Sequence, residues 1–371
     1  MKQGRLFKTS PYILNKKERQ EIKKQIIEES GLHEEIKQQA LDNIGKSEKE
    51  IKEEKQLSID NVKQKIMEEL EREQVELYNT DIAISATKLT TYRGCPFAYF
   101  LEYKLHLPKK SPPNVKAGLA FHQVLADFNR GNLNTLEELI EGREIIENGK
   151  KKKIPGWKGR WYQASYAKDV YFEDEKERHI IFEKGVKLLE KFYERENGKP
   201  RASQFIEHKF KELVNINGKE YLLEGTFDKI DTATRPTKII DYKTGSFLSK
   251  NTKDFGLQLT IYYLCYKKML ESCKIVGSAE PEIIVYGFSF SDCEIEEYCT
   301  ARSNIDVDYL EQQIKLFLEG LKSRNFVPFV PSSRFDHCKK CNWNHNDFCR
   351  NLLYSNNKEI FRIMQNAVKK Y

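Results

Sequence analysis

The spacing of apolar and polar positions divides the chain into two regions that meet near residue 80. Lys, Glu and Gln dominate residues 16–77, where apolar residues such as Val62, Ile66 and Leu70 recur at helical spacing. No heptad pattern is sustained, so we expect solvated helices rather than a long coiled coil. Residues 1–80 are therefore predicted to form a charged helical extension. A docking arm for a partner subunit or for DNA is the alternative.

Beyond residue 80 the pattern predicts an alternation of helices and strands. Helices are expected over residues 84–100, 117–129, 171–195, 255–270 and 306–322. Strands are expected over residues 204–210, 221–230, 238–243, 282–290 and 293–300. Ser85 or Thr87 is expected to cap the first helix, and Asn217-Gly218 to form the turn between the first two strands. This order predicts an α/β fold.

Composition and charge are those of a globular protein with solvated helices added. Charged residues make up 32% of the 371 residues, and the formal net charge is +7. This excess is compatible with nucleic acid but does not prove it, because the charge is spread along the chain. No apolar run reaches the roughly 18 to 20 residues of a membrane span, and no apolar signal core follows the N-terminus. We therefore expect a cytoplasmic protein without a membrane partner.

Two acidic residues and a lysine are expected to converge on one hairpin. In the simplest register of the strands around residues 232–237, Asp228 lies opposite Asp241, with the Cβ atoms about 5 Å apart. Lys243 follows two residues later and therefore lies on the same face. Carboxylates this close repel unless a cation lies between them, and oxygen ligands suit Mg²⁺ or Mn²⁺. The alternative is a solvated hairpin with ordinary surface charges.

Four of the eight cysteines have the spacing of a metal site. Three form the cluster Cys338-x2-Cys341-x7-Cys349, and Cys95 lies far upstream. In a reducing compartment such a set binds metal rather than forming disulfides. Both Zn²⁺ and a [4Fe–4S] cluster accept four thiolates, and His337 and His345 add possible zinc ligands. The remaining cysteines show no ligand spacing and are expected in or near the core: Cys265, Cys273, Cys293 and Cys299.

Four short motifs carry a resemblance to a known family. They are Gly225-Thr-Phe-Asp228, Ile239-Ile-Asp241-Tyr-Lys243, Gly118-Leu-Ala-Phe-His122 and Gln258-Leu-Thr-Ile-Tyr262. Taken together, they resemble the core of the PD-(D/E)XK nuclease superfamily, and more closely its RecB-like branch. That branch includes the AddB nuclease domain and the CRISPR adaptation nucleases that carry an iron–sulfur cluster. The resemblance covers roughly residues 84–350 and leaves the N-terminal extension unexplained.

The resemblance implies a fold and a domain organisation. A restriction-endonuclease-like core, with a central mixed sheet flanked by helices, is expected over residues 81–330. Within it, residues 132–200 are expected to form a helical insertion. Residues 331–371 are expected to form a cysteine cluster and a tail helix, which close on Cys95 as an iron–sulfur clamp.

The resemblance also implies the ligands of a divalent metal. His122, Asp228 and Asp241 would hold Mg²⁺ or Mn²⁺, together with the backbone carbonyl of Tyr242. Glu207 corresponds to an acid that some members of the family place on the first strand, and it would be a further ligand. A neutral imidazole can complete a metal shell made mostly of oxygen atoms.

Three further residues receive catalytic roles from the resemblance. Lys243 would be the catalytic lysine. Gln258 and Tyr262 lie four residues apart, hence on one helix face, and would face the DNA or the active site. The alternative for Tyr262 is a half-buried core aromatic. For the cysteine site, the resemblance favours the iron–sulfur cluster over zinc and gives it a structural role.

The expected function is a metal-dependent DNA nuclease, an exonuclease that acts on single-stranded ends. DNA repair or recombination, CRISPR adaptation, and phage-related or antiviral DNA processing are the settings of the family. No phosphate loop of an ATPase is present, so a helicase would have to be a separate partner. Basic segments at residues 109–110 and 150–153 are expected to contact phosphates. The alternative is a non-catalytic subunit that binds DNA or scaffolds a helicase–nuclease complex.

Overall fold

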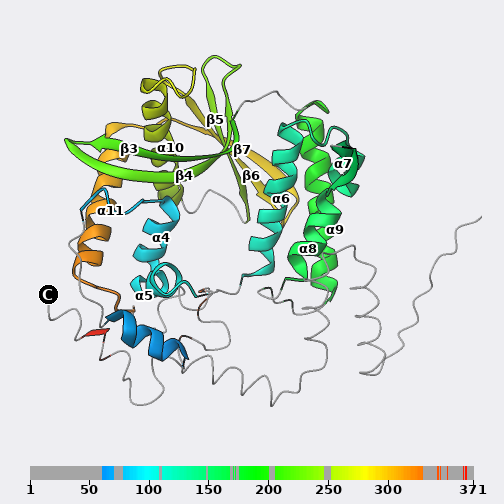
Figure 1. Ribbon diagram of the computed structural model, residues 1–371. Helices are drawn as coiled ribbons and strands as arrows, with labels where there is room; N and C mark the ends of the chain where they lie inside the picture. The colour runs from blue at the N-terminus through cyan, green and yellow to red at the C-terminus, as the bar shows by residue number, and fades with distance from the viewer. Residues whose placement is uncertain are drawn as a thin grey trace, which may run out of the picture.

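A central sheet with helices on both faces forms the described part of the molecule (Figure 1). The computed structural model describes residues 61–70, 78–107, 111–147, 149–167, 170, 172, 175–199, 205–245, 252–328, 341, 343, 349, 362 and 364–365, with the side chains of 147 and 252–255 excepted. Most of the predicted N-terminal extension therefore lies outside the described residues.

Within the described residues the sheet has five strands, in the order β3-β4-β5-β6-β7. Their bounds are β3 Phe205–Ile216, β4 Lys219–Asp231, β5 Lys238–Thr244, β6 Glu282–Ser289 and β7 Glu294–Thr300. Strands β5 and β6 are parallel, and the other neighbours are antiparallel. The parallel pair requires a crossover, which a helix between β5 and β6 provides. The predicted mixed sheet is confirmed.

Helices cover both faces of the sheet. Their bounds are α4 Ala86–Gly94, α5 Pro96–Tyr99, α6 Pro113–Asn129, α7 Leu136–Glu141, α8 Trp157–Ser165, α9 Glu175–Arg195, α10 Thr252–Glu271 and α11 Asn304–Lys322. In Figure 1, α4, α10 and α11 lie on one side and α6 to α9 on the other. Consecutive strand residues point to opposite faces, so Ile239 is buried among the first group and Ile240 among the second.

The β3–β4 hairpin extends beyond the rest of the sheet. Asn217 and Gly218 form its turn with φ values of 50° and 83°, as the Asn-Gly pair predicts. Phe210 lies opposite Gly225, and a Cβ on that glycine would lie 2.6 Å from the Phe210 ring. At Glu207 the backbone has φ 50°, which interrupts the regular alternation of β3 just where the strand reaches the acidic residues of β4.

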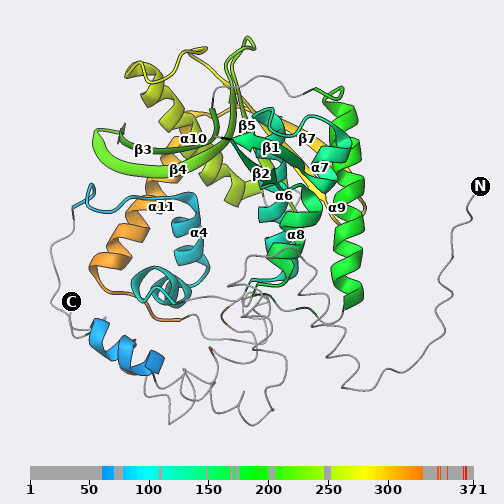
Figure 2. The same ribbon diagram turned by 45° about the vertical axis from the view of Figure 1, so that its right-hand side comes forward.

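The segment predicted as a helical insertion also contains strands. Between α7 and α8 a hairpin of β1 Arg143–Glu147 and β2 Lys150–Ile154 is formed. The lysine run of β2 is exposed and shows no apolar alternation, so the pattern gave no signal for a strand. Trp157 and Trp161 are fully buried and stack at 5.6 Å. Figure 2 shows the hairpin beside α6, α7 and α8.

The single helix expected over residues 84–100 is wrong, because the helix breaks at Cys95. Its backbone is extended (φ −164°, ψ 112°) and separates α4 from α5. The cause is Pro96, because a proline disfavours the helical conformation in the preceding residue. Helix α5 then continues as a π-helical turn over Phe100–Lys104. Ser85 caps α4 by accepting a hydrogen bond from the Lys88 amide, which confirms one of the two predicted caps.

The helix over residues 61–70 belongs to the main core, although solvated helices were expected there. Its residues Val62 and Ile66 are 6% and 0% exposed and join the same hydrophobic cluster as α4, α10 and α11. At the end of this helix, the Arg324 guanidinium donates a hydrogen bond to the Leu70 carbonyl at 2.9 Å. The helical spacing of these apolar residues is confirmed, and the described helix is packed rather than solvated. No helix among the described residues is long and apolar enough to cross a membrane.

Candidate active site

Three potential metal ligands converge from three elements. His122 of α6, Glu207 of β3 and Asp228 of β4 place one ligand atom each within 4.8 Å of one another. His122 Nδ1 lies 3.6 Å from Asp228 Oδ2. Helix α6 comes this close because Gly118, one turn before His122, packs on Thr244 of β5, where an added Cβ would overlap the threonine hydroxyl. An imidazole and two carboxylates are a donor set that fits a divalent cation.

Asp241 and Lys243 form a buried ion pair beside these ligands. Asp241 is fully buried, and the Lys243 ammonium lies 2.7 Å from its Oδ1 and 2.6 Å from its Oδ2. Gln258 of α10 donates to Asp241 Oδ1 at 3.2 Å and to the Tyr262 hydroxyl at 2.7 Å. Tyr262 in turn donates to the Thr226 carbonyl at 2.5 Å. This chain of hydrogen bonds fixes the carboxylate of Asp241 between β5 and α10.

The pairing of β4 with β5 ends at the acidic residues. Strand β4 pairs with β5 through Lys229↔Ile240, and the same register places Asp228 opposite Asp241, as predicted. At this point the Asp228 carboxylate, rather than a main-chain carbonyl, accepts the Tyr242 amide at 2.7 Å. Beyond it no β4–β5 pairing is formed among the described residues, and His122 of α6 contacts Asp228 while Gln258 of α10 contacts Asp241.

Burial shifts the pKa values of the site strongly. Burial and the charge of Lys243 lower the pKa of His122 to about 4, so its imidazole is neutral at pH 7. Burial raises the pKa of Asp241 to about 6 and that of Asp228 above its ordinary value. Burial and the neighbouring Asp228 raise the pKa of Glu207 to about 7. The charge of Lys243 offsets only part of this burial at Asp228 and Asp241, and a bound cation would supply further positive charge.

The structure gathers the predicted residues into two adjacent groups. The convergent ligand group contains His122, Glu207 and Asp228 but not Asp241, whose carboxylate contacts Lys243 and Gln258. The backbone of Tyr242 reaches the site through its bonds to Asp228 and His122. Its side chain lies on the opposite face of the sheet, in the core with α6.

A buried polar network behind the site was not predicted. Lys229, 1% exposed, donates to the Asn129 side chain at 2.7 Å, and Asn129 donates to the Tyr242 hydroxyl at 3.1 Å. Lys229 directly follows Asp228 and anchors that end of β4 to α6. Alternation along β4 could have placed it on the face opposite Asp228, but its partner comes from a distant helix.

The cysteine site is described in part. Cys95, Cys341 and Cys349 are half-buried and pack against one hydrophobic cluster, which also contains Trp343. Cys338 lies outside the described residues. Three of the four predicted ligands, separated by some 250 residues of chain, therefore contact the same core. Of the cysteines without ligand spacing, Cys265 is buried in that core, Cys293 is half-buried, and Cys273 and Cys299 are exposed.

Comparison with known proteins identifies one family. The family model described as the PD-(D/E)XK nuclease superfamily matches residues 83–350. One subunit of an ATP-dependent helicase/deoxyribonuclease from Caldanaerobacter subterraneus subsp. tengcongensis is 26% identical over 281 residues, 68% of this chain and 23% of that protein. The protein of the same description from Carboxydothermus hydrogenoformans is 27% identical over 201 residues, 49% of this chain and 18% of that protein. The chain thus spans about a fifth of the length of these curated relatives.

Proposed function

Because the chain belongs to the PD-(D/E)XK nuclease superfamily, we propose that it is a divalent-metal-dependent deoxyribonuclease. One observation carries the proposal: His122, Glu207 and Asp228 converge within 4.8 Å, and the Asp241–Lys243 ion pair lies next to them. A structural salt bridge alone would not require three further ligand atoms in the same place. The relatives are consistent with the expected RecB-like branch.

The residues of the site have separate tasks in this proposal. His122, Glu207, Asp228 and Asp241 would hold Mg²⁺ or Mn²⁺, with the Tyr242 carbonyl as an additional ligand. When bound, such an ion activates water and neutralises phosphate charge. Lys243, held 2.7 Å from Asp241, places a positive charge where a cleaved phosphate would develop negative charge. Its ammonium can also hold the attacking water in position.

The substrate we propose is a single-stranded DNA end, cut exonucleolytically. The names of the relatives support DNA, since each is described as part of a helicase/deoxyribonuclease. They also support a helicase as a partner supplied in trans. The exposed lysines of β2, residues 150–153, offer phosphate contacts outside the active site.

For the cysteines we propose a structural [4Fe–4S] cluster held by Cys95, Cys338, Cys341 and Cys349, with Zn²⁺ as the alternative. The common packing of Cys95, Cys341 and Cys349 on one hydrophobic cluster supports a shared site. Such a site would join the beginning of the nuclease region to its end.

The decisive experiment is cleavage of end-labelled single strands with Mg²⁺ or Mn²⁺. Asp241→Ala and Lys243→Ala should each abolish cleavage, while circular dichroism shows a folded protein. Asp308→Ala, an exposed aspartate of α11, is the control and should cut normally. Undiminished cleavage by both site variants would disprove the assignment. If the wild-type protein binds DNA but never cuts it with either metal, the non-catalytic scaffold becomes the better account.

A further inference from the structure

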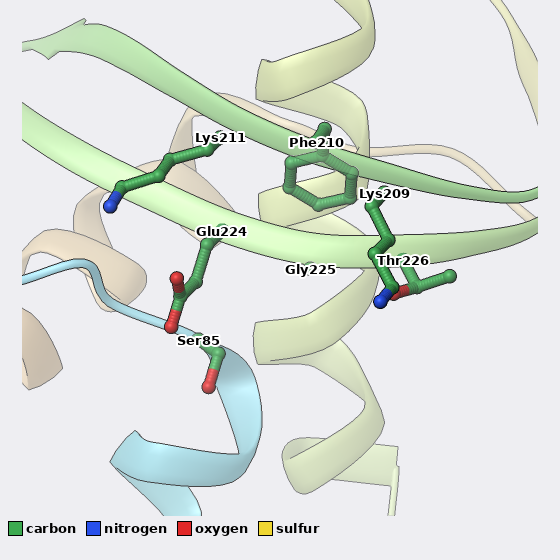
Figure 3. Close-up of a pocket in the computed structure, with 7 residues that line it drawn as sticks. All are labelled: Ser85, Lys209, Phe210, Lys211, Glu224, Gly225 and Thr226. Carbon is green, nitrogen blue, oxygen red and sulfur yellow. The ribbon is translucent and has the colours of Figure 1, made fainter.

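A pocket of about 460 Å³ lies between the β3–β4 hairpin and the first turn of α4. Figure 3 shows its polar side chains: Glu224 extends from the hairpin toward Ser85, the residue that caps α4, and Lys211 and Lys209 lie on either side of Glu224, with Thr226 beside Lys209. The Phe210 ring and Gly225 form its apolar part. We refer to it as the hairpin pocket.

The hairpin pocket carries an excess of positive charge. Cross-strand neighbours are Lys209↔Thr226 and Lys211↔Glu224. The Glu224 carboxylate is held by Lys88 of α4 at 2.7 Å. Lys209 and Lys211 are exposed, and within the described part of the chain neither forms an ion pair. Lys88 thus offsets the charge of Glu224, and the two ammonium groups of Lys209 and Lys211 are available to an anion.

The hairpin pocket is joined to the active site through Thr226. Its carbonyl accepts the Tyr262 hydroxyl, and Tyr262 is linked through Gln258 to Asp241. Thr226 also precedes the metal-ligand candidate Asp228 by two residues, a distance of roughly 7 Å along a strand. A DNA strand carries one phosphate about every 3.4 Å of its length in a duplex, and less densely when extended. A strand that passes Asp228 along the hairpin would therefore place its next phosphates over Lys209 and Lys211.

We propose that the hairpin pocket is a phosphate subsite for single-stranded DNA next to the bond that is cut. Lys209 and Lys211 neutralise consecutive phosphates, and the polar rim of Ser85 and Thr226 faces the sugar–phosphate backbone. The proposal rests on the proposed nuclease function, because it places the pocket beside the reacting phosphate. It adds two residues to substrate binding that contact neither the metal ligands nor Lys243.

The first test measures single-stranded DNA binding in EDTA, so that no strand is cut. Log affinity falls as log salt rises, and each lost phosphate contact makes this slope shallower by about 0.7 for single strands. We therefore expect the slope of Lys209→Ala/Lys211→Ala to be shallower by about 1.4. The matched control is Lys176→Ala/Lys187→Ala, which removes two exposed charges from α9 on the other side of the sheet. The control should keep the wild-type slope. An unchanged slope in the pocket variant, or an equal loss in the control, would overturn the proposal.

The second test locates the contact along the strand. Oligonucleotides carry one uncharged methylphosphonate linkage, moved stepwise away from the cleaved bond. At the linkage that the hairpin pocket holds, loss of the charge should weaken binding to the wild-type protein but not to Lys209→Ala/Lys211→Ala. If both proteins respond equally at every position, the lysines do not hold a defined phosphate, and the proposal fails.

Cleavage with Mg²⁺ is measured separately, which distinguishes this proposal from the nuclease proposal. If the wild-type protein cuts DNA but the two lysines do not affect the salt slope, the pocket proposal fails and the nuclease proposal stands. If the protein never cuts DNA but the lysines affect the salt slope and one phosphate position responds to them, the pocket proposal stands. The nuclease proposal then fails.

Discussion

Asp241 is a buried carboxylate whose position depends on three side chains. Lys243 balances its charge, and Gln258 links it to Tyr262 of the next helical turn. The residue types could be predicted from the sequence because Asp-x-Lys lies on one strand face and Gln-x-x-x-Tyr on one helix face. Their mutual contact could not, because it depends on how α10 packs against β4 and β5. Glu207 likewise reaches the site only through a backbone irregularity with φ 50°.

Tyr262→Phe should reduce both stability and cleavage. It removes the buried hydroxyl that donates to the Thr226 carbonyl and orients Gln258, so we expect a loss of about 1–3 kcal/mol in the free energy of unfolding. Urea unfolding and cleavage rates measure the two effects. The control is Tyr263→Phe, whose hydroxyl bonds Glu280 at the surface and should cost less than about 0.5 kcal/mol. Equal losses in the two variants would contradict this role of Tyr262.

Protons and metal should compete at the site. The raised pKa values of Glu207, about 7, and Asp241, about 6, give the metal-free protein stability at low pH that is lost as the pH rises through these values. The lowered pKa of His122 acts in the opposite direction, adding stability as the pH rises from about 4 to 6.5. At pH 8 the acids are ionised and the imidazole is neutral, so all three groups can bind a cation.

Mg²⁺ should therefore raise the midpoint of thermal unfolding more at pH 8 than at pH 6. Differential scanning fluorimetry with and without the ion measures this difference. Glu207→Gln removes one group at which a proton competes with Mg²⁺. The Mg²⁺-induced rise of the midpoint should therefore differ less between pH 6 and pH 8 in this variant. An equal Mg²⁺ effect at both pH values in the wild-type protein would argue against these residues as the ligands.

At the scale of elements, strands with local signals were predictable and strands without them were not. The β3–β4 hairpin follows from Asn217-Gly218 and from alternating apolar residues, and its pairing with β5 follows from the short turn between them. Strand β2 consists mostly of lysines and is held by pairing with β1, so no apolar pattern marks it. The break at Cys95 was indicated by Pro96, but the aromatic run around it suggested a continuous helix.

Two helical glycines should respond to alanine in opposite directions. An added Cβ at Gly185 of α9 would overlap the buried Trp157 ring, so Gly185→Ala should destabilise the protein by about 1–3 kcal/mol. At Gly256 of α10 the nearest atom, on Arg302, lies 3.9 Å from that position. Gly256→Ala should therefore stabilise by about 0.5–1 kcal/mol through helix propensity. Chemical unfolding checks both, and a stabilised Gly185→Ala would show that α8 and α9 do not pack as described.

At the scale of the whole molecule, distant segments meet on one core. The helix of residues 61–70, Cys95, Trp343 and Met364 all contact the hydrophobic cluster between the sheet and α10. From the sequence, only the cysteine spacing indicated that these distant segments meet. A pattern of apolar residues does not show which core a segment packs against. The second cluster, with α6, α8 and α9, is built from residues close in sequence and from the other face of the sheet.

Cys95→Ser should release the metal and weaken the packing of the C-terminal residues on the core. We expect less bound iron, or less zinc if that is the metal, a weaker absorption near 400 nm in the iron case, and a lower midpoint of thermal unfolding. Metal analysis after anaerobic purification provides the measurement. Cys273→Ser, which changes an exposed cysteine, should retain both metal and stability. Full metal content in Cys95→Ser would exclude this residue as a ligand.

Ile84 covers part of an edge of β4 that no described strand pairs with. Among the described residues, the part of β4 before Asp228 pairs with β3 on one side, and Ile84 bridges its other side at Leu223. The Ile84 amide donates to the Leu222 carbonyl at 2.8 Å, and the Ile84 carbonyl accepts the Glu224 amide at 2.9 Å. Unpaired strand edges are templates for association between copies of a protein. A truncated form that begins after Ile84 would therefore expose this edge and tend to aggregate. One that begins at residue 78 would keep it covered.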